Sequence, residues 1–158
     1  MFEGEVMKTR LESAIKFAMH VHEGHLDKGG HLDILHAFRV MLKVVDNLKI
    51  PAVLHDVIED GAGIVEGVTL PSRVSCILLC HGDTQGFWLT DEEHSILNAL
   101  TKSVDEPYEN YIQRILPVTP ANMIKIADLE DHLHSDRVAN ISAGLIQRYT
   151  KALKVLTE

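Results

Sequence analysis

Basic residues are scarce in this sequence of 158 residues. It has 15 Lys and Arg against 23 Asp and Glu, so its formal net charge is −8 at pH 7. Surfaces that bind nucleic acid broadly need clustered Lys and Arg to replace counterions. The charge balance therefore argues against a broad nucleic-acid surface, although a few local cations could still bind a small phosphate-bearing ligand.

Long apolar runs are also missing. No stretch approaches the length of a membrane-spanning helix, and no basic segment followed by an apolar one opens the sequence. We therefore expect a cytoplasmic protein that does not bind membranes. The two cysteines, Cys76 and Cys80, are four residues apart in an apolar stretch. Consecutive turns of one helix are poorly placed for a disulfide, so we interpret both as buried, reduced thiols.

The hydrophobic pattern is helical almost throughout, and the sequence contains no internal repeat or low-complexity tract. The length fits one domain, so we expect a single domain over 1–158. The fold class predicted is all-α, with about seven to eight helices. These are expected over 11–22, 34–47, 50–60, 71–80, 90–102, 107–116, 121–134 and 142–156. A short strand over 65–70 is compatible with the sequence, but no other segment pairs with it convincingly.

The segment His55–Asp60 has the most distinctive composition. A helix turns about 100° per residue, so His55, Asp56, Glu59 and Asp60 would share one side of a helix. Three adjacent carboxylates repel one another, and a cation would relieve that repulsion. Imidazole with carboxylate is a ligand set that suits divalent first-row metals. The alternative is an acidic helix end that faces solvent.

Two more polar residues, His36 and Asp128, interrupt otherwise apolar helices. A lone histidine in such a place is usually a core residue with its hydrogen bonds satisfied. A buried carboxylate without a partner is costly, so Asp128 should pair with Lys125, a metal or a distant group. Together with His55 and Asp56 they make a set of two nitrogen and two oxygen ligands. Such a set leaves open positions for water and substrate, as a catalytic metal requires.

The order of these residues resembles that of the HD-domain metal-dependent phosphohydrolases. The resemblance is closest to the branch that hydrolyses alarmones, which includes the hydrolase domain of SpoT-like proteins and the small alarmone hydrolases. It covers nearly the whole chain and rests on seven segments: Ala18–Gly24, Asp27–Gly30, His36–Val40, Leu54–Asp60, Leu100–Lys102, Lys125–Leu129 and Arg148–Ala152. In the family a proline follows the histidine that corresponds to His36, and here Ala37 stands at that position.

The resemblance implies a single HD-type helical bundle and a role for each matching residue. Four residues would bind Mn²⁺ or another divalent transition metal: His36, His55, Asp56 and Asp128. Glu59 and Asp60 would position or activate the attacking water. Lys28 would contact phosphate, and Tyr149 would contact the base or ribose.

Two positions depart from the family pattern. His132 stands where the family usually has Asn, and could donate a hydrogen bond to substrate or act as an extra ligand or acid. Asp27 stands where an arginine commonly precedes the position of Lys28. Arg39 and Lys125 are further candidate cations for the substrate. For these two and for Lys28 the alternative is a solvated side chain or a helix ion pair, and for Lys125 this alternative is the better one.

The expected function is therefore hydrolysis of a nucleotide polyphosphate. The favoured substrate is an alarmone of the guanosine 3′,5′-bis(diphosphate) type, with release of pyrophosphate. One alternative is an HD phosphohydrolase of another nucleotide or phosphoester. Another is a regulatory module that binds metal or nucleotide without turnover, against which Glu59 and Asp60 argue. The expected partner is a small nucleotide, and a homo-oligomer is compatible with the sequence.

Overall fold

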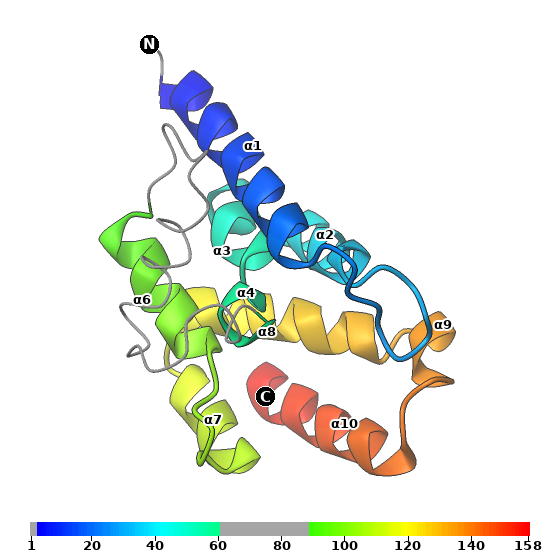
Figure 1. The fold of residues 1–158 in the computed structure, drawn as a ribbon. Helices are drawn as coiled ribbons and strands as arrows, with labels where there is room; N and C mark the ends of the chain where they lie inside the picture. The colour runs from blue at the N-terminus through cyan, green and yellow to red at the C-terminus, as the bar shows by residue number, and fades with distance from the viewer. Residues whose placement is uncertain (1–2, 61–88) are drawn as a thin grey trace.

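The computed structural model describes residues 3–60 and 89–158, and these residues form an all-α bundle (Figure 1). The predicted fold class is confirmed. The elements are α1 (Glu3–Val21), α2 (Ile34–Lys43), the 3₁₀ turn η1 (Asp46–Leu48), α3 (Lys49–Val53), α4 (Val57–Asp60), α6 (Asp91–Leu100), α7 (Tyr108–Ile115), α8 (Thr119–His132), α9 (Ser135–Val138) and α10 (Ala143–Thr157).

Several predictions concern residues outside these ranges. The helix over 71–80, the strand over 65–70 and both cysteines lie outside the described residues. Within the described ranges, no helix is long and apolar enough to cross a membrane.

Helix α8 occupies the middle of the bundle, where it contacts α2, α6, α7 and α10 (Figure 1). Its residues Ala121, Ile124 and Ala127 recur at a spacing of three and are buried, and so is Leu129. This is the apolar stripe of a helix that packs against several neighbours. Because Asp128 lies on this helix, its carboxylate is carried into the interior of the bundle.

Helix α6 begins with a capping box. The hydroxyl of Thr90 accepts a hydrogen bond from the backbone N–H of Glu93, whose carboxylate accepts one from the backbone N–H of Thr90. The same carboxylate lies 2.5 Å from the guanidinium of Arg10, and both side chains are buried. Glu93 thereby fixes the start of α6 and also joins α6 to α1.

The segment around His55 is not one continuous helix, so that prediction is wrong. Helix α3 ends at Val53, α4 begins at Val57, and a turn separates them. The His55 ring donates from Nδ1 to the carbonyl oxygen of Ala52 at 2.8 Å, and the His55 backbone N–H also points to it at 3.4 Å. In a continuous helix this carbonyl would accept the N–H of Asp56. The side chain competes for the carbonyl, and the helix is interrupted there.

Asp33 precedes α2, but its side chain does not cap that helix. The carboxylate lies 3.5 Å from Nδ1 of the buried His22 instead, which lowers the pKa of Asp33. Asp33 therefore connects the end of α1 to the start of α2.

Candidate metal centre

Three imidazole rings surround one carboxylate oxygen in the interior of the bundle. Oδ1 of Asp128 lies 3.0 Å from Nε2 of His36, 3.1 Å from Nε2 of His132 and 3.8 Å from Nε2 of His55. Oδ2 of Asp56 lies 3.1 Å from Nε2 of His55 and 3.7 Å from Nε2 of His36. The structure therefore brings together all four residues that the sequence suggests as metal ligands. That they bind metal stays a prediction.

Three different elements supply these side chains. His36 comes from α2, His55 and Asp56 from the turn between α3 and α4, and Asp128 from α8. His36, His55 and Asp128 are each at most 4% exposed, whereas Asp56 is half-buried. The turn matters here because it aims His55 and Asp56 toward α8 while their neighbours pack in the core.

The cluster contains buried polar atoms that a metal ion would satisfy. Nε2 of His36, Nε2 of His55 and Oδ1 of Asp128 make no hydrogen bond to any described residue. Such atoms are costly unless something binds them. The Nδ1 atom of each ring already donates, that of His36 to Asp131 at 2.7 Å and that of His55 to Ala52. Each Nε2 is thereby left as the ligand atom, which is the arrangement of metal-binding histidines.

Two overlapping groups of side chains have ligand atoms close enough to hold an ion. One consists of His36, His55 and Asp56, and the other of His36, Asp128 and His132. The residues present therefore fit a divalent metal with mixed imidazole and carboxylate ligands.

The charges in the cluster are strongly coupled. Burial alone would raise the pKa of Asp128, but Lys125 and the surrounding imidazoles lower it well below its ordinary value. Burial alone would lower the pKa of His55, but Asp56 and Asp128 raise it well above its ordinary value. The pKa of His36 is raised in the same way, by Asp128 and Asp131 against the effect of burial. The carboxylates of Asp56, Asp128 and Asp131 therefore stabilise positive charge on the groups between them.

Asp131 is a functional candidate that the sequence reasoning missed. Its buried carboxylate accepts from Nδ1 of His36, from Arg39 at 2.7 Å and from Arg137 at 2.6 Å. Burial would raise its pKa, but these three partners lower it far below the ordinary value. Its position three residues after Asp128, on the same face of α8, is the one signal that could have revealed it.

The structure does not bring Arg39 to the same place as the other proposed substrate contacts. Its guanidinium makes two hydrogen bonds to Asp131 and lines a different hollow, beside α2. Lys125 also has a nearby partner, because its ammonium lies 2.6 Å from Oδ2 of Asp128. For Lys125 this is the helix ion pair that the sequence offered as the alternative, whereas Arg39 pairs with an acid on a different helix.

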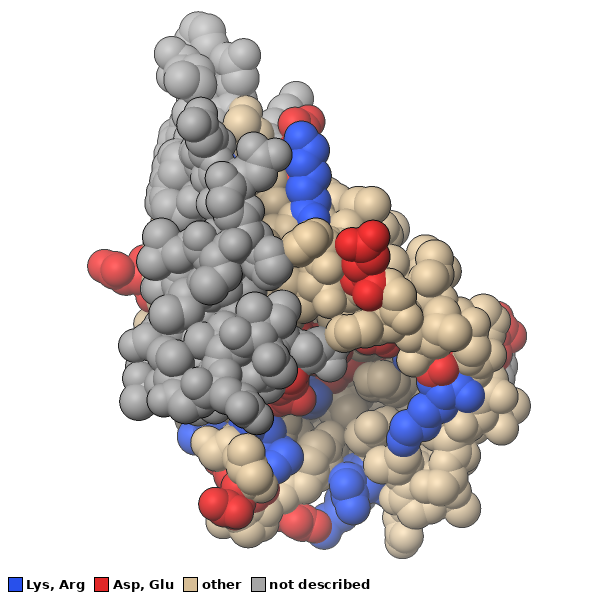
Figure 2. All heavy atoms as spheres, in the orientation of Figure 1, with Lys and Arg blue, Asp and Glu red and all other residues tan. Residues whose placement is uncertain are grey.

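A cavity of about 320 Å³ opens beside the cluster and is lined by His55, Asp56, Asp128 and His132 among others. Glu59 also lines it, and its carboxylate accepts the backbone N–H of Lys102 at 3.0 Å. The side chain of Asp60 lies outside the described part of the chain, so its predicted role stays a prediction. Figure 2 shows acidic and basic side chains around a hollow on this face of the molecule.

A second cavity, of about 210 Å³, adjoins the first and contains Lys28. His132 and Tyr149 line both cavities. Their rings stack with centroids 5.2 Å apart and planes 30° apart. The cavity that contains Lys28 therefore shares part of its wall with the cavity beside the cluster.

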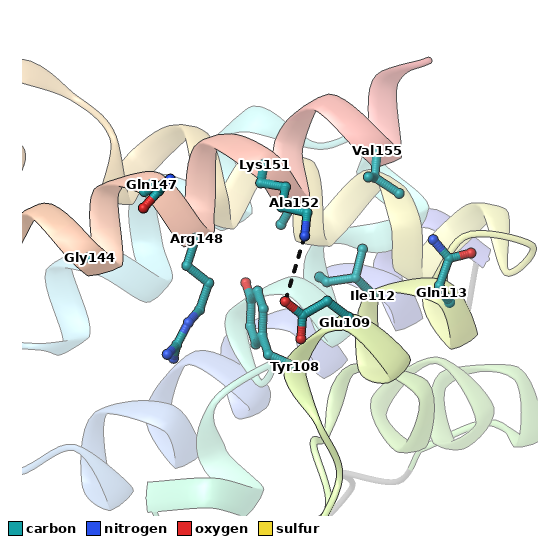
Figure 3. Close-up of a pocket in the computed structure, with 10 residues that line it drawn as sticks. All are labelled: Tyr108, Glu109, Ile112, Gln113, Gly144, Gln147, Arg148, Lys151, Ala152 and Val155. Carbon is teal, nitrogen blue, oxygen red and sulfur yellow. Dashed lines mark ion pairs between the residues drawn. The ribbon is translucent and has the colours of Figure 1, made fainter.

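A groove of about 400 Å³ lies between α7 and α10, and it is lined by side chains from both helices (Figure 3). Tyr108 and Arg148 line this groove as well as the central cavity, with the Arg148 guanidinium 5.5 Å from the centroid of the Tyr108 ring. Lys151 and Glu109 form an ion pair across it at 3.7 Å. The central cavity is thus continued on two sides, toward Lys28 and along α10.

Comparison with known proteins assigns no family, because no family model and no curated protein matches this chain. The functional argument therefore depends on the residues of the cluster and its cavities.

Proposed function

We propose that the chain is a metal-dependent phosphohydrolase that acts on a nucleotide polyphosphate. The favoured substrate is an alarmone of the guanosine 3′,5′-bis(diphosphate) type. One observation carries the proposal: the unsatisfied Nε2 atoms of His36 and His55 and the unsatisfied Oδ1 of Asp128, from three different elements, lie together beside an open cavity. A fully satisfied polar core would leave no such atoms buried.

Four residues would hold the metal, namely His36, His55, Asp56 and Asp128. A bound Mn²⁺ or similar ion would lower the pKa of water toward neutrality and offset charge on a phosphoryl oxygen. Glu59 would accept the proton of the attacking water. Its carboxylate lines the same cavity and accepts a hydrogen bond from the backbone N–H of Lys102, which helps to orient it.

The proposed reaction breaks the bond between the ribose 3′ oxygen and phosphorus. Water adds to that phosphorus, the 3′ oxygen leaves as a hydroxyl after taking up a proton, and pyrophosphate is the second product. Arg148 lies where the central cavity meets the α7–α10 groove, and Lys28 lies at the other side. Cations on both sides suit a substrate with phosphates at two positions. Tyr149 offers a ring to the base or ribose.

Two alternatives make different predictions for the same cavity. A hydrolase of another nucleotide or phosphoester would use the same cluster with different contacts at Lys28 and Arg148. A binding module without turnover would need no proton acceptor. The placement of Glu59 in the cavity beside the ligands favours an enzyme.

The test is hydrolysis by the purified protein with Mn²⁺ or with EDTA. The reaction would be followed by ³¹P NMR, which separates phosphate from pyrophosphate. The substrates tested would be nucleoside diphosphates, nucleoside triphosphates, a guanosine bis(diphosphate) and a simple aryl phosphate. We expect pyrophosphate release that EDTA abolishes and that Glu59→Gln lowers at least 100-fold, with metal binding retained. Glu12→Gln, an exposed change on α1, serves as the control. Nucleotide binding without turnover would identify the binding module. A protein that shows no nucleotide binding and no turnover would contradict the proposal.

A further inference from the structure

We infer that His132 is a fifth ligand of the same metal ion, so that the site contains three imidazoles and two carboxylates. The inference rests on the proposed metal centre and extends it. His132 follows Asp128 by four residues on α8, so both side chains project from one face of that helix. Its Nε2 lies 3.1 Å from Oδ1 of Asp128, about as close as Nε2 of His36 at 3.0 Å.

The distances match those between neighbouring ligands of one ion. Ligand atoms about 2.1 Å from an ion lie about 3.0 Å apart at right angles and about 4.2 Å apart on opposite sides. The pairs His36–Asp128, His132–Asp128 and His55–Asp56 are separated by 3.0, 3.1 and 3.1 Å. Two further pairs, His36–Asp56 and His55–Asp128, are separated by 3.7 and 3.8 Å. Every one of these separations falls within the range that a single ion spans.

The two groups of candidate ligands share His36, so together they can hold only one ion. The Nδ1 atom of this ring is engaged by Asp131, so only Nε2 is left as a ligand atom. A neutral imidazole nitrogen has one lone pair in the ring plane and binds one metal. Two ions cannot share it. His132 therefore joins the ion held by His36 rather than forming a second site.

The surroundings of His132 keep its ring in place. Tyr149 stacks on it from α10, and the ring of His36 lies 4.5 Å from it, centroid to centroid. Its side chain is 24% exposed and lines both the central cavity and the Lys28 cavity. A histidine that only donated to Asp128 would occupy the same position, so the experiment must distinguish ligation from hydrogen bonding.

A third imidazole changes which metals the site should prefer. Carboxylate-rich sites suit Mn²⁺, whereas imidazole suits zinc, nickel, copper and iron. With His132 bound, the site should favour Co²⁺, Ni²⁺ or Zn²⁺ over Mn²⁺ more strongly than the same site without it. The proposed hydrolase would still accept Mn²⁺, but its tightest ion would be a different one.

The experiment measures metal binding without nucleotide. Co²⁺ and Mn²⁺ are titrated into the metal-free protein by calorimetry, and the visible absorption of the Co²⁺ form reports the number and type of ligands. His132→Asn removes the imidazole but keeps an amide that can donate to Asp128. His134→Asn, an exposed histidine two residues further on, is the matched control. Thermal unfolding in EDTA checks that the variants fold.

We expect His132→Asn to lower Co²⁺ affinity at least tenfold, to lower Mn²⁺ affinity less, and to change the Co²⁺ absorption. His134→Asn should change none of these. An unchanged Co²⁺ spectrum and an unchanged ratio of Co²⁺ to Mn²⁺ affinity in His132→Asn would overturn the inference, as would a wild-type protein that binds neither ion. Co²⁺ binding that depends on His132 in a protein without turnover would support the inference while refuting the hydrolase.

Discussion

The carboxylate of Asp131 lies 2.7 Å from Nδ1 of His36 and orients the ring whose other nitrogen faces the metal cluster. It also accepts from Arg39 and Arg137, so its own position is fixed by two guanidinium groups. Such an outer partner selects the tautomer and strengthens the ligand. Asp131 is therefore a positioning residue for the proposed metal centre.

Replacing Asp131 by Asn should weaken metal binding by about 10- to 100-fold. The amide carries no charge to balance His36 and the two arginines, and its carbonyl oxygen is a weaker acceptor for the His36 ring. Calorimetric titration with Mn²⁺ measures the loss. Glu130→Gln is the control, since Glu130 is the neighbouring acid on α8 and is 51% exposed. Equal affinity in Asp131→Asn and wild type would show that the hydrogen bond does not act on the metal.

Lys125 should be essential for the stability of the metal-free protein. Its ammonium pairs at 2.6 Å with Asp128, and its side chain is only 14% exposed. Lys125→Met leaves a buried carboxylate that has lost its main cation, which should lower the free energy of unfolding by about 3 kcal/mol. Urea denaturation in EDTA measures it. Addition of Mn²⁺ should restore part of the lost free energy of unfolding, because an ion at the cluster would supply the missing positive charge.

Lys151→Met provides the comparison for this experiment. That lysine also forms an ion pair, but its side chain is 69% exposed. Exposed pairs contribute little, so we expect a change of roughly 0.5 kcal/mol or less. Similar losses in the two variants would contradict the assigned role of Lys125.

The pair between Arg10 and Glu93 should hold α1 against α6. Both side chains are buried, and the residues are 83 positions apart in sequence. Glu93→Gln keeps a group that can cap α6 but removes the buried carboxylate charge beside Arg10, so the free energy of unfolding should fall by about 3 kcal/mol. Thermal unfolding with circular dichroism is sufficient to detect this. The neighbouring Glu92→Gln should stay within about 0.5 kcal/mol of wild type, because Glu92 is exposed.

Glu106 should make part of the stability depend on pH. Its two carboxylate oxygens each lie 2.9 Å from the Arg114 guanidinium, and these hydrogen bonds outweigh burial and lower its pKa below the ordinary 4.5. A carboxyl group with a lowered pKa in the folded state stabilises that state above its unfolded pKa. The contribution is lost as the pH falls through the folded pKa.

The variant Glu106→Gln should therefore be less stable than wild type at pH 7, by about 1 kcal/mol because Arg114 is partly exposed. The difference should shrink toward zero near pH 3. Urea denaturation at both pH values measures it. A difference that is the same at pH 7 and pH 3 would mean that the charge of Glu106 is not responsible.

The sequence identifies best the features that neighbouring residues determine. The capping box at Thr90 and the serine cap at Ser142 begin α6 and α10 where expected, because each bonds to a backbone N–H three residues away. Helix α2 is shorter than expected and ends at Lys43, where Val44 takes an extended conformation. The apolar spacing continues through that point, so periodicity did not reveal the end.

Long-range relationships account for what the sequence did not reveal. His55 interrupts its helix through a bond from its ring to Ala52, and no hydrophobic pattern encodes that competition. Asp131 was missed because its partners His36 and Arg39 are 95 and 92 residues away. The four candidate ligands were recognised by residue type and order, and the spacing of four residues already places His132 on the same helix face as Asp128. The approach of His132 to His36 shows only in three dimensions.

Arg148 should affect substrate binding more than the chemical step. It lies where the central cavity meets the α7–α10 groove, and it packs near Tyr108 (Figure 3). If it contacts a phosphate remote from the reacting one, Arg148→Gln removes a charged hydrogen bond worth about 1.5–3 kcal/mol. We expect KM for the guanosine bis(diphosphate) to rise at least tenfold while kcat stays within about twofold.

A small aryl phosphate separates this binding role from a role in chemistry. Such a substrate has no second phosphate to place at the groove, so Arg148→Gln should lower its kcat/KM much less than that of the guanosine bis(diphosphate). Lys154→Gln removes an exposed cation from the same helix and controls for net charge. An equal fall in kcat/KM on both substrates would mean that Arg148 acts in the chemical step. An unchanged kcat/KM on both would mean that Arg148 does not contact the substrate. Steady-state kinetics on the two substrates therefore determine whether the groove along α10 belongs to the substrate-binding surface.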